Sequence, residues 1–540
     1  MRKPIYALAA LTLTVSLLLA ACARPAPSPT SPAAPTTPPP TTAPAPKASP
    51  TPPPGPAETP QYGGVYKLAF HTSLRTLFPA LSAATMGPVS AIFDYLMVAD
   101  DKGEELFPQL AIEWKLNPDA TSFTLTLRKG VKFHDGTDFN ATSVKWNIEQ
   151  RKAARLGDYD EVTSISIVDD YTVRLNLSTF RNTMMVPLWY TGSQVYSQTA
   201  YEKNGKDWAA LNPVGTGPFK FVNYEKDQLL KTVRFDGYWQ KGRPYLDGFD
   251  IHYIADTTTR VFAFLKGDVD HVTNLTPTEA KDLTSKGYRL RGVPDTVTAL
   301  FPDSANTDSP FASKKVREAV EYAIDRARIA SALGFGLWKP ANQISIISPA
   351  NIPDLKGREY DPAKAKQLLA EAGYPNGFKT SMYFRSTTAT RDALVAYATN
   401  LKSVGIEVTL EPVPIAKFTQ LSQDGWRGLL AEIIWETPDW LQTVYTRMSI
   451  TSTISKSVLR PSGWQEVLDQ AIAATDASTK KTLSQQVVRK AFDEVAVIPL
   501  MITGSPSFTQ DHAHAGEPVG NGGRLSSLYT DYWLSKKGNK

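Results

Sequence analysis

The chain has 540 residues, of which 42% are hydrophobic and 21% are charged, and its formal net charge is +5. This length exceeds what one compact core supports, so two or three domains are expected. The small net charge gives no reason to expect a nucleic-acid partner, which would require a dense basic patch. One cysteine excludes an internal disulfide framework, and six histidines leave little material for a metal centre.

The N-terminus has the pattern of a lipoprotein signal peptide. Two basic residues precede an apolar run from Ile5 to Ala21, and Cys22 follows directly after small residues. This order resembles a bacterial lipobox, and the run is at the short end for a membrane span. We therefore expect 1–21 to be a signal peptide and Cys22 to carry acyl chains that hold the protein at a membrane surface. An ordinary secretory signal and a weak transmembrane helix are the alternatives.

The next segment is of low complexity. Residues 24–60 contain 16 of the 41 prolines, mixed with Ala, Thr and Ser. Such a stretch cannot bury a core and is expected to be extended and solvated, with a reach on the order of 100 Å. We interpret 22–60 as a lipidated cysteine followed by a tether, or as a spacer across a cell-wall layer.

A folded body is predicted from Gln61 onward. Alternating apolar and polar residues predict strands, and 3.6-residue periodicity predicts helices. The strands are expected at 65–70, 121–128, 220–224, 229–235, 250–254 and 268–272, with a hairpin at 164–177. The helices are expected at 141–154, 257–266, 314–334, 362–372, 464–473 and 478–495. Thr137 or Asn140 is expected to cap the first of them. A strand, helix and strand at 378–384, 389–404 and 406–412 predict a βαβ unit, and hence an α/β fold with a parallel or mixed sheet.

Several motifs in this body, in this order, resemble one family. The most specific are Phe123–Asp138 (FTLTLRKGVKFHDGTD), Pro213–Phe219 (PVGTGPF), Leu265–Asp270 (LKGDVD), Lys315–Arg326 (KVREAVEYAIDR) and Asp361–Gly377 (DPAKAKQLLAEAGYPNG). They are similar to the family 5 extracellular solute-binding proteins, which include oligopeptide-, dipeptide- and nickel-binding components of ABC importers. The resemblance extends from Gly63 to Leu500.

The resemblance implies a two-lobed periplasmic-binding-protein-like fold of type II, with an extra subdomain in the first lobe. The expected ranges are 61–86, 208–295 and 500–540 for the core of lobe I, 87–207 for the extra subdomain, and 296–499 for lobe II. Ligand would be enclosed between the lobes by hinge closure and delivered to a membrane permease with its ATPase subunits. The implied protein is an extracytoplasmic monomer with no catalytic activity, cofactor or metal.

Charged residues within the motifs are interpreted as structural. Arg128 and Asp135 are expected to pair and fix a turn, whereas Arg317 and Asp325 are expected to bind helix ends and carbonyl groups. The dipeptide His134-Asp135 is interpreted as part of the same turn and not as a catalytic dyad.

A loop near residue 435 is the first candidate for ligand contact. The family often has a Trp followed by Asp-Tyr-x-Asp-Pro, whose first Asp holds a peptide's α-amino group. Trp435 fits this pattern, but Pro438 stands where the amine-binding Asp would be, and Asp439 lies one residue away. This departure puts peptide binding in doubt.

The residues present suggest a mixed surface. Trp435 and Trp440 supply flat apolar area for stacking, and Glu432, Glu436 and Asp439 supply acceptors, which would suit a cationic or hydroxyl-rich ligand such as an amine or a sugar. The alternatives are that the tryptophans belong to the core and that the carboxylates lie on a solvated loop.

Four further residues are candidates for the ligand site. Arg75 follows the first strand and could pair with a carboxylate. Trp338 and Asn342 lie in a loop after a long predicted helix, and Arg385 follows the strand 378–384.

Other functions remain as alternatives. The chain has no Gly-x-Ser-x-Gly and no Gly-rich phosphate loop with Lys, which disfavours a hydrolase. His512 and His514 are expected in a loop and not at a metal. A ligand sensor that docks on a membrane receptor, and a binding protein for sugars, amines or nickel chelates, stay open.

Overall fold

The computed structural model describes residues 59–82, 88–99, 105–156, 158–292, 296–346, 349–386, 391–435, 439–514 and 529–536. The expected signal peptide, Cys22 and nearly all of the expected tether lie outside these residues. The body, Thr59–Lys540, is one compact unit.

The first sheet has seven strands in the order β12-β19-β11-β1-β10-β9-β8. Its strands are β1 (Val65–Phe70), β8 (Phe219–Glu225), β9 (Leu229–Arg234), β10 (Gly248–Tyr253), β11 (His271–Val272), β12 (Arg289–Arg291) and β19 (Ser507–Thr509). The central strand β1 pairs in parallel with β10 and β11. Alternate residues of β1 are buried, Tyr66 and Leu68 among them, so one face of the strand packs on the core.

A four-stranded antiparallel sheet, β4-β5-β7-β6, forms a second core with the helix α1 (Ala141–Ala153). Its strands are β4 (Ala111–Leu116), β5 (Ser122–Leu127), β6 (Val162–Asp169) and β7 (Thr172–Leu177). The predicted hairpin at 164–177 is confirmed as β6 and β7. Asn140, one of two residues expected to cap the helix at 141–154, accepts a hydrogen bond from the backbone N–H of Ser143. We call this sheet, α1 and the short 3-10 helix η3 (Asn182–Met185) the four-stranded subdomain.

The third sheet has six strands in the order β14-β18-β13-β17-β15-β16. Its strands are β13 (Thr296–Pro302), β14 (Lys339–Pro340), β15 (Phe378–Arg385), β16 (Ile406–Val413), β17 (Leu429–Trp435) and β18 (Ile498–Thr503). The predicted βαβ unit is confirmed, because β15 and β16 are parallel and the helix α10 (Arg391–Ser403) connects them.

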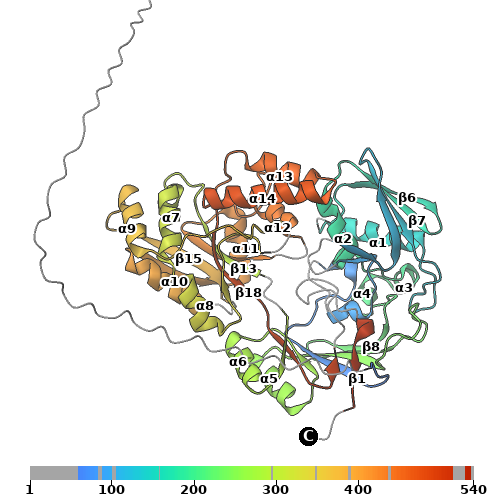
Figure 1. Cartoon of the computed structure of the whole chain (residues 1–540). Helices are drawn as coiled ribbons and strands as arrows, with labels where there is room; N and C mark the ends of the chain where they lie inside the picture. Colours follow the sequence, from blue (N-terminus) through green and yellow to red (C-terminus); the bar gives the residue numbers. More distant parts are fainter. Residues whose placement is uncertain are drawn as a thin grey trace, which may run out of the picture. The chain divides into compact units, whose positions relative to one another are not determined.

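Helices cover both faces of this six-stranded sheet (Figure 1). Residues of α7 to α10 form one hydrophobic core with it, and residues of α11 to α14 form another. The helices of the body are α1 (Ala141–Ala153), α2 (Val186–Trp189), α3 (Gln198–Asn204), α4 (Lys206–Ala209), α5 (Thr257–Lys266), α6 (Pro277–Ser285), α7 (Lys314–Ala323), α8 (Arg326–Gly334), α9 (Pro362–Glu371), α10 (Arg391–Ser403), α11 (Ile415–Asp424), α12 (Trp440–Met448), α13 (Trp464–Ala473) and α14 (Ala477–Asp493).

Two connections join the seven-stranded and six-stranded sheets. The chain passes from β12 to β13 and returns from β18 to β19. The two passages run side by side in opposite directions, because β12 pairs with β19 and β13 pairs with β18, both antiparallel. At the six-stranded end, Thr296 Oγ1 donates to the carbonyl oxygen of Thr503 over 3.0 Å. We call these passages the inter-sheet connections. Because β18 extends to Thr503, the expected lobe boundary at residue 500 falls inside this strand.

The long helix predicted at 314–334 is two helices. The chain leaves helical geometry at Ile324, and Asp325 then caps α8 by accepting a hydrogen bond from the N–H of Arg328. The periodicity continued across the break because both helices bury apolar residues on the same core. The expectation that Asp325 binds a helix end is confirmed.

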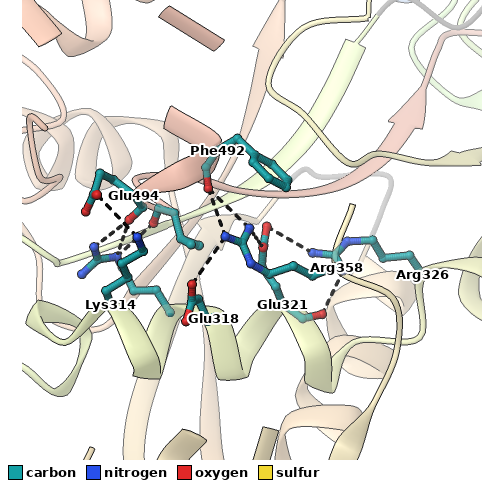
Figure 2. Close-up of polar contacts among 9 residues, drawn as sticks. Lys314, Glu318, Glu321, Arg326, Arg358, Phe492 and Glu494 are labelled. Atoms are coloured by element: carbon teal, nitrogen blue, oxygen red, sulfur yellow. Dashed lines mark hydrogen bonds and ion pairs between the residues drawn. The ribbon is translucent and has the colours of Figure 1, made fainter. Parts of the chain in front are cut away.

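Charged side chains fix α7 to the chain around it (Figure 2). The carboxylate of Glu321, 4% exposed, lies 2.6 Å from Arg358 and 3.7 Å from Arg326. The guanidinium of Arg358 also lies over the ring of Phe492 on α14. Arg317 donates to the carbonyl oxygens of Glu494, Val495, Phe311 and Ala312, which confirms its expected role.

The expected ion pair between Arg128 and Asp135 is wrong. Arg128 Nε donates to the carbonyl oxygen of Gln109, and its guanidinium lies over the ring of Trp239. Asp135 accepts hydrogen bonds from Thr137 and Ser197. Each side chain therefore fixes a different part of the backbone, and sequence proximity alone suggested the pair.

Candidate functional site

One edge of the six-stranded sheet gathers the ends of several strands. β15, β16 and β17 are mutually parallel, so Arg385, Val413 and Trp435 end at a common edge. Trp435 pairs with Thr296, where β13 begins, and so the inter-sheet connections enter at this edge too. Ligands of open α/β sheets bind at the carboxyl ends of strands. This edge is therefore the candidate site.

Two arginines share one buried carboxylate there. Arg385, at the end of β15, lies 3.1 Å from Glu432 on the neighbouring strand β17. Arg447, on α12, lies 3.4 Å from the same carboxylate, which also accepts a hydrogen bond from the backbone N–H of Ile433. The carboxylate of Glu432 is therefore fully engaged. We call Arg385, Glu432 and Arg447 the Arg–Glu–Arg cluster.

The cluster has one more positive charge than negative. The side chain of Glu432 is 4% exposed and that of Arg447 is 17% exposed, whereas the side chain of Arg385 is 33% exposed. The Arg385 guanidinium lies over the ring of Phe418, and its buried Nε has no hydrogen-bond partner among the described residues. Arginine presents several donors in a planar fork that suits carboxylates. The cluster can therefore take a further anionic group at Arg385.

A small cavity adjoins the cluster. Its volume is about 40 Å³, enough for very few water-sized molecules. It is lined by Thr298, Ala299, Phe384, Arg385, Leu394, Tyr397, Ala431, Glu432, Ile433 and Leu500. The lining is mostly apolar, with Arg385 and Glu432 as its charged members. Small-molecule sites have volumes of about 300–1,000 Å³, so this cavity is too small to hold a solute in the described arrangement.

Two predicted site residues hold the helix that carries Arg447. Asp439 caps α12 by accepting from the N–H groups of Leu441 and Gln442, and it lies 2.8 Å from Lys480 on α14. Trp440 is buried, and its Nε1 donates to the carbonyl oxygen of Ile344. In the described arrangement both side chains are engaged within the protein.

The remaining predicted residues lie apart from the cluster. Trp338 is buried in the core between the six-stranded sheet and α7 to α10. Asn342 donates to the carbonyl oxygen of Leu355, and Arg75 is exposed after β1. Glu436 and the side chain of Trp435 lie outside the described residues. Of the predicted site residues, the structure places Arg385 and Glu432 at the charged part of the site.

Arg447 was missed by sequence reasoning. It lies on the apolar stripe of α12, among the buried residues Trp440, Val444 and Met448. An arginine at such a position needs a buried partner, and this signal could have suggested it. Nothing in the sequence indicates that its partner is Glu432, because the pairing depends on how α12 packs on the sheet.

The histidines singled out in the sequence have structural partners. His134 Nε2 lies 2.8 Å from the carbonyl oxygen of Gly217, and His512 Nε2 lies 2.9 Å from Asp270. No group of three or more potential metal ligands gathers within the described part of the chain. Within those same residues, no helix is long and apolar enough to span a membrane.

Two α/β bodies joined by paired connections, with the candidate site at the edge where these enter, define a two-lobed binding protein of the periplasmic type. The model of the bacterial extracellular solute-binding proteins, family 5, matches residues 105–447. The chain belongs to this family. Its members bind small ligands outside the cytoplasm and deliver them to an ABC permease, and the chain is a binding protein and not an enzyme.

Named relatives and solved structures show the same relationship. The glutathione-binding protein GsiB of Shigella flexneri is 28% identical over 428 residues, 74% of this chain and 81% of that protein. The binding protein AgaA of A. tumefacien R10, solved with agropinic acid, is 25% identical with a TM-score of 0.73, covering 88% of this chain and 99% of AgaA. DppA of Helicobacter pylori, solved with the peptide STSA, is 23% identical with a TM-score of 0.73, over the same shares.

Proposed function

We propose that this chain is a lipid-anchored binding protein of an ABC importer that captures a peptide-like solute through a free carboxylate. The observation that carries the ligand class is the Arg–Glu–Arg cluster, whose excess positive charge is most exposed at Arg385. Two of the three carboxylates expected to favour a cation are engaged within the protein, since Glu432 binds two arginines and Asp439 binds Lys480. An anionic group therefore fits the described residues better than an amine does.

The relatives support this ligand class. GsiB is named for glutathione, AgaA was solved with agropinic acid and DppA with a peptide. Glutathione and unmodified peptides carry free carboxylates, and agropinic acid is named as an acid. A common requirement for a carboxylate partner would explain why related sites bind such different solutes.

Capture would proceed by hinge closure about the inter-sheet connections. These are two short passages, so rotation there can move the two bodies without disturbing either sheet. A ligand that contacts both bodies favours the closed state by its differential affinity for that state. The permease would then receive the ligand from the closed protein.

Matched ligands test the carboxylate requirement. Residues 61–540 would be titrated calorimetrically with reduced glutathione, with Ala-Ala-Ala and with the C-terminal amide of Ala-Ala-Ala. A bound carboxylate should make the acid bind at least about tenfold more tightly than the amide, since a charge-assisted hydrogen bond contributes about 1.5–3 kcal/mol. Equal affinities for acid and amide would contradict the proposal, and so would the absence of binding by every carboxylate in a wider panel of peptides and sugar acids.

Arg385→Ala tests the residue. It should remove the preference for acid over amide while Arg447 still engages Glu432. Lys379→Ala is the control, because Lys379 lies on the same strand with its side chain 85% exposed. A ligand preference that survives Arg385→Ala would assign the carboxylate to another residue.

The anchor has its own test. Cells expressing the full chain would be labelled with a palmitate analogue, and the wild type compared with Cys22→Ser. Label on the wild type alone, together with release of the Cys22→Ser chain from the membrane fraction, is the expected result. Equal labelling would refute lipidation at Cys22.

A further inference from the structure

We call the six-stranded sheet with its helices α7 to α14 the six-stranded body. The four-stranded subdomain contacts this body away from the inter-sheet connections. The side chain of Asn182, at the start of η3, donates its Nδ2 hydrogens to the carbonyl oxygens of Ala471, over 2.7 Å, and Ala474, over 3.1 Å. Both acceptors lie at the C-terminal end of α13. Asn182 and α13 are far apart in the sequence and meet only through the tertiary fold.

A second contact lies beside the first. The guanidinium of Arg181 lies over the ring of Tyr445, 4.9 Å from its centre, and Arg181 also pairs with Glu161 at 3.3 Å. Tyr445 belongs to α12, the helix that carries Arg447. We call Arg181 and Asn182, with Tyr445 and the end of α13, the clasp.

The hydrogen bonds of Asn182 are directed across this boundary. The last carbonyl groups of a helix lack partners within it, and the Asn182 amide supplies hydrogens to two of them. Its Oδ1 is buried without a hydrogen-bond partner among the described residues, and the residue is 8% exposed. The side-chain hydrogen bonds of Asn182 therefore join the four-stranded subdomain to α13 and do not stabilise the subdomain itself.

We propose that the described arrangement is the closed one, and that the clasp stabilises it and thereby raises ligand affinity without contacting the ligand. The inference rests on the proposed function in one respect, namely that ligand capture requires closure. The four-stranded subdomain is held to the segments beside β1 and β8. Arg151 on α1 donates to the carbonyl oxygen of Pro79, and His134 Nε2 lies 2.8 Å from that of Gly217.

If the four-stranded subdomain rotates away from the six-stranded sheet about the inter-sheet connections, Asn182 leaves α13 and Arg181 leaves Tyr445. A contact that exists in one state alone shifts the equilibrium toward that state. Arg181 and Asn182 are thus positioning residues for the site at Arg385.

Two substitutions at one position make the inference quantitative. Asn182→Ala removes both donors and should raise the ratio of open to closed protein about tenfold, the effect of losing one to two ordinary hydrogen bonds. Asn182→Asp keeps the shape but sets a carboxylate against two carbonyl oxygens, so it should open the protein further. Asn176→Ala is the matched control, because Asn176 lies on β7 of the same subdomain and binds Ser164 and Ser166 there.

The measurement does not depend on knowing the ligand. A full chain carrying Cys22→Ser has no native cysteine, so dyes can be placed on Asp170→Cys and Lys366→Cys, both exposed, one in each part. Single-molecule energy transfer then reports the open and closed populations of the ligand-free protein. The expected order of closed population is wild type and Asn176→Ala first, then Asn182→Ala, then Asn182→Asp, with melting temperatures within a few degrees of the wild type.

Titration with reduced glutathione adds a second measurement. Where glutathione binds, the Asn182 variants should release it faster than the wild type, since the closed state is less stable. If all ligand-free variants have the same closed population as the wild type, the proposed role of the clasp is wrong, whichever ligand the protein binds. Failure of glutathione and all other carboxylates to bind would instead overturn the proposed ligand class, while the ligand-free populations would still decide the clasp.

Discussion

The carboxylate of Glu432 and the guanidinium of Arg385 lie 3.1 Å apart between neighbouring parallel strands, with Glu432 almost wholly buried. Glu432→Gln would leave Arg385 and Arg447 facing each other without a negative charge. We expect the free energy of unfolding to fall by about 2–3 kcal/mol, below the full cost of breaking a buried ion pair because Arg385 is partly exposed. Urea denaturation of the body measures this. A loss under 0.5 kcal/mol, on the order of a surface pair, would show that the cluster is not buried as described.

Substitutions of Asp439 distinguish a role in holding α12 from a direct contact with the ligand. Asp439→Ala removes the cap of α12 and the pair with Lys480, so stability should fall by about 1–2 kcal/mol. Asp439→Asn keeps a capping oxygen and should cost less. Ligand affinity, measured by calorimetry, should change much less than it does in Arg385→Ala. Loss of binding without loss of stability would instead make Asp439 a ligand contact.

His134 predicts a dependence of stability on pH. Burial lowers the pKa of His134 to about 4, against about 6.5 for a free histidine. Between about pH 6.5 and pH 4, His134 is therefore protonated in the unfolded chain and neutral in the folded chain. The free energy of unfolding falls as the pH drops through this range. At about pH 4, His134 lowers the free energy of unfolding by about 3 kcal/mol relative to neutral pH.

His134→Gln cannot titrate, so its urea midpoint should depend less on pH across this window. Some dependence should remain, because burial also lowers the pKa of His271, to about 3. An unchanged pH profile in His134→Gln would show that His134 titrates normally in the folded protein.

Two substitutions in the network of Figure 2 should lower the free energy of unfolding by very different amounts. Burial raises the pKa of Glu321, and Arg326 and Arg358 oppose this rise by favouring its ionised form. Arg358→Ala should lower the free energy of unfolding by about 3 kcal/mol, since it leaves a buried carboxylate with only the more distant Arg326. Lys314→Ala breaks only the exposed pair with Glu494 and should cost under about 0.5 kcal/mol. Equal losses in the two variants would contradict this assignment.

Much of the fold could be predicted because local patterns and family motifs agree. The parallel pair β15 and β16, the cap at Asn140 and the role of Arg317 depend on periodicity or on motif residues. The break at Ile324 could not be predicted, since two helices that pack on one core keep a common apolar period across it. The expected lobe ranges and the lipid anchor stay predictions.

The candidate site was harder to predict because its charges come from three separate elements. Arg385 could be proposed from its place at the end of a strand. Glu432 was noted as an acceptor, but its two arginine partners could not be inferred, since they depend on the packing of β17 against β15 and α12. Trp440 and Asp439 drew attention by composition, whereas their contacts are set by Ile344 and Lys480.

The position of β19 bears on how the protein folds during export. β19 lies between β11 and β12 and pairs with both, yet it follows them in the chain by the whole of the six-stranded body. Until Ser507–Thr509 arrive, β11 and β12 keep unpaired edges, and the first sheet stays incomplete. A chain that emerges N-terminus first therefore cannot finish its first sheet before nearly all of it has crossed the membrane. Non-local pairing of this kind slows folding, which would favour an unfolded chain during passage.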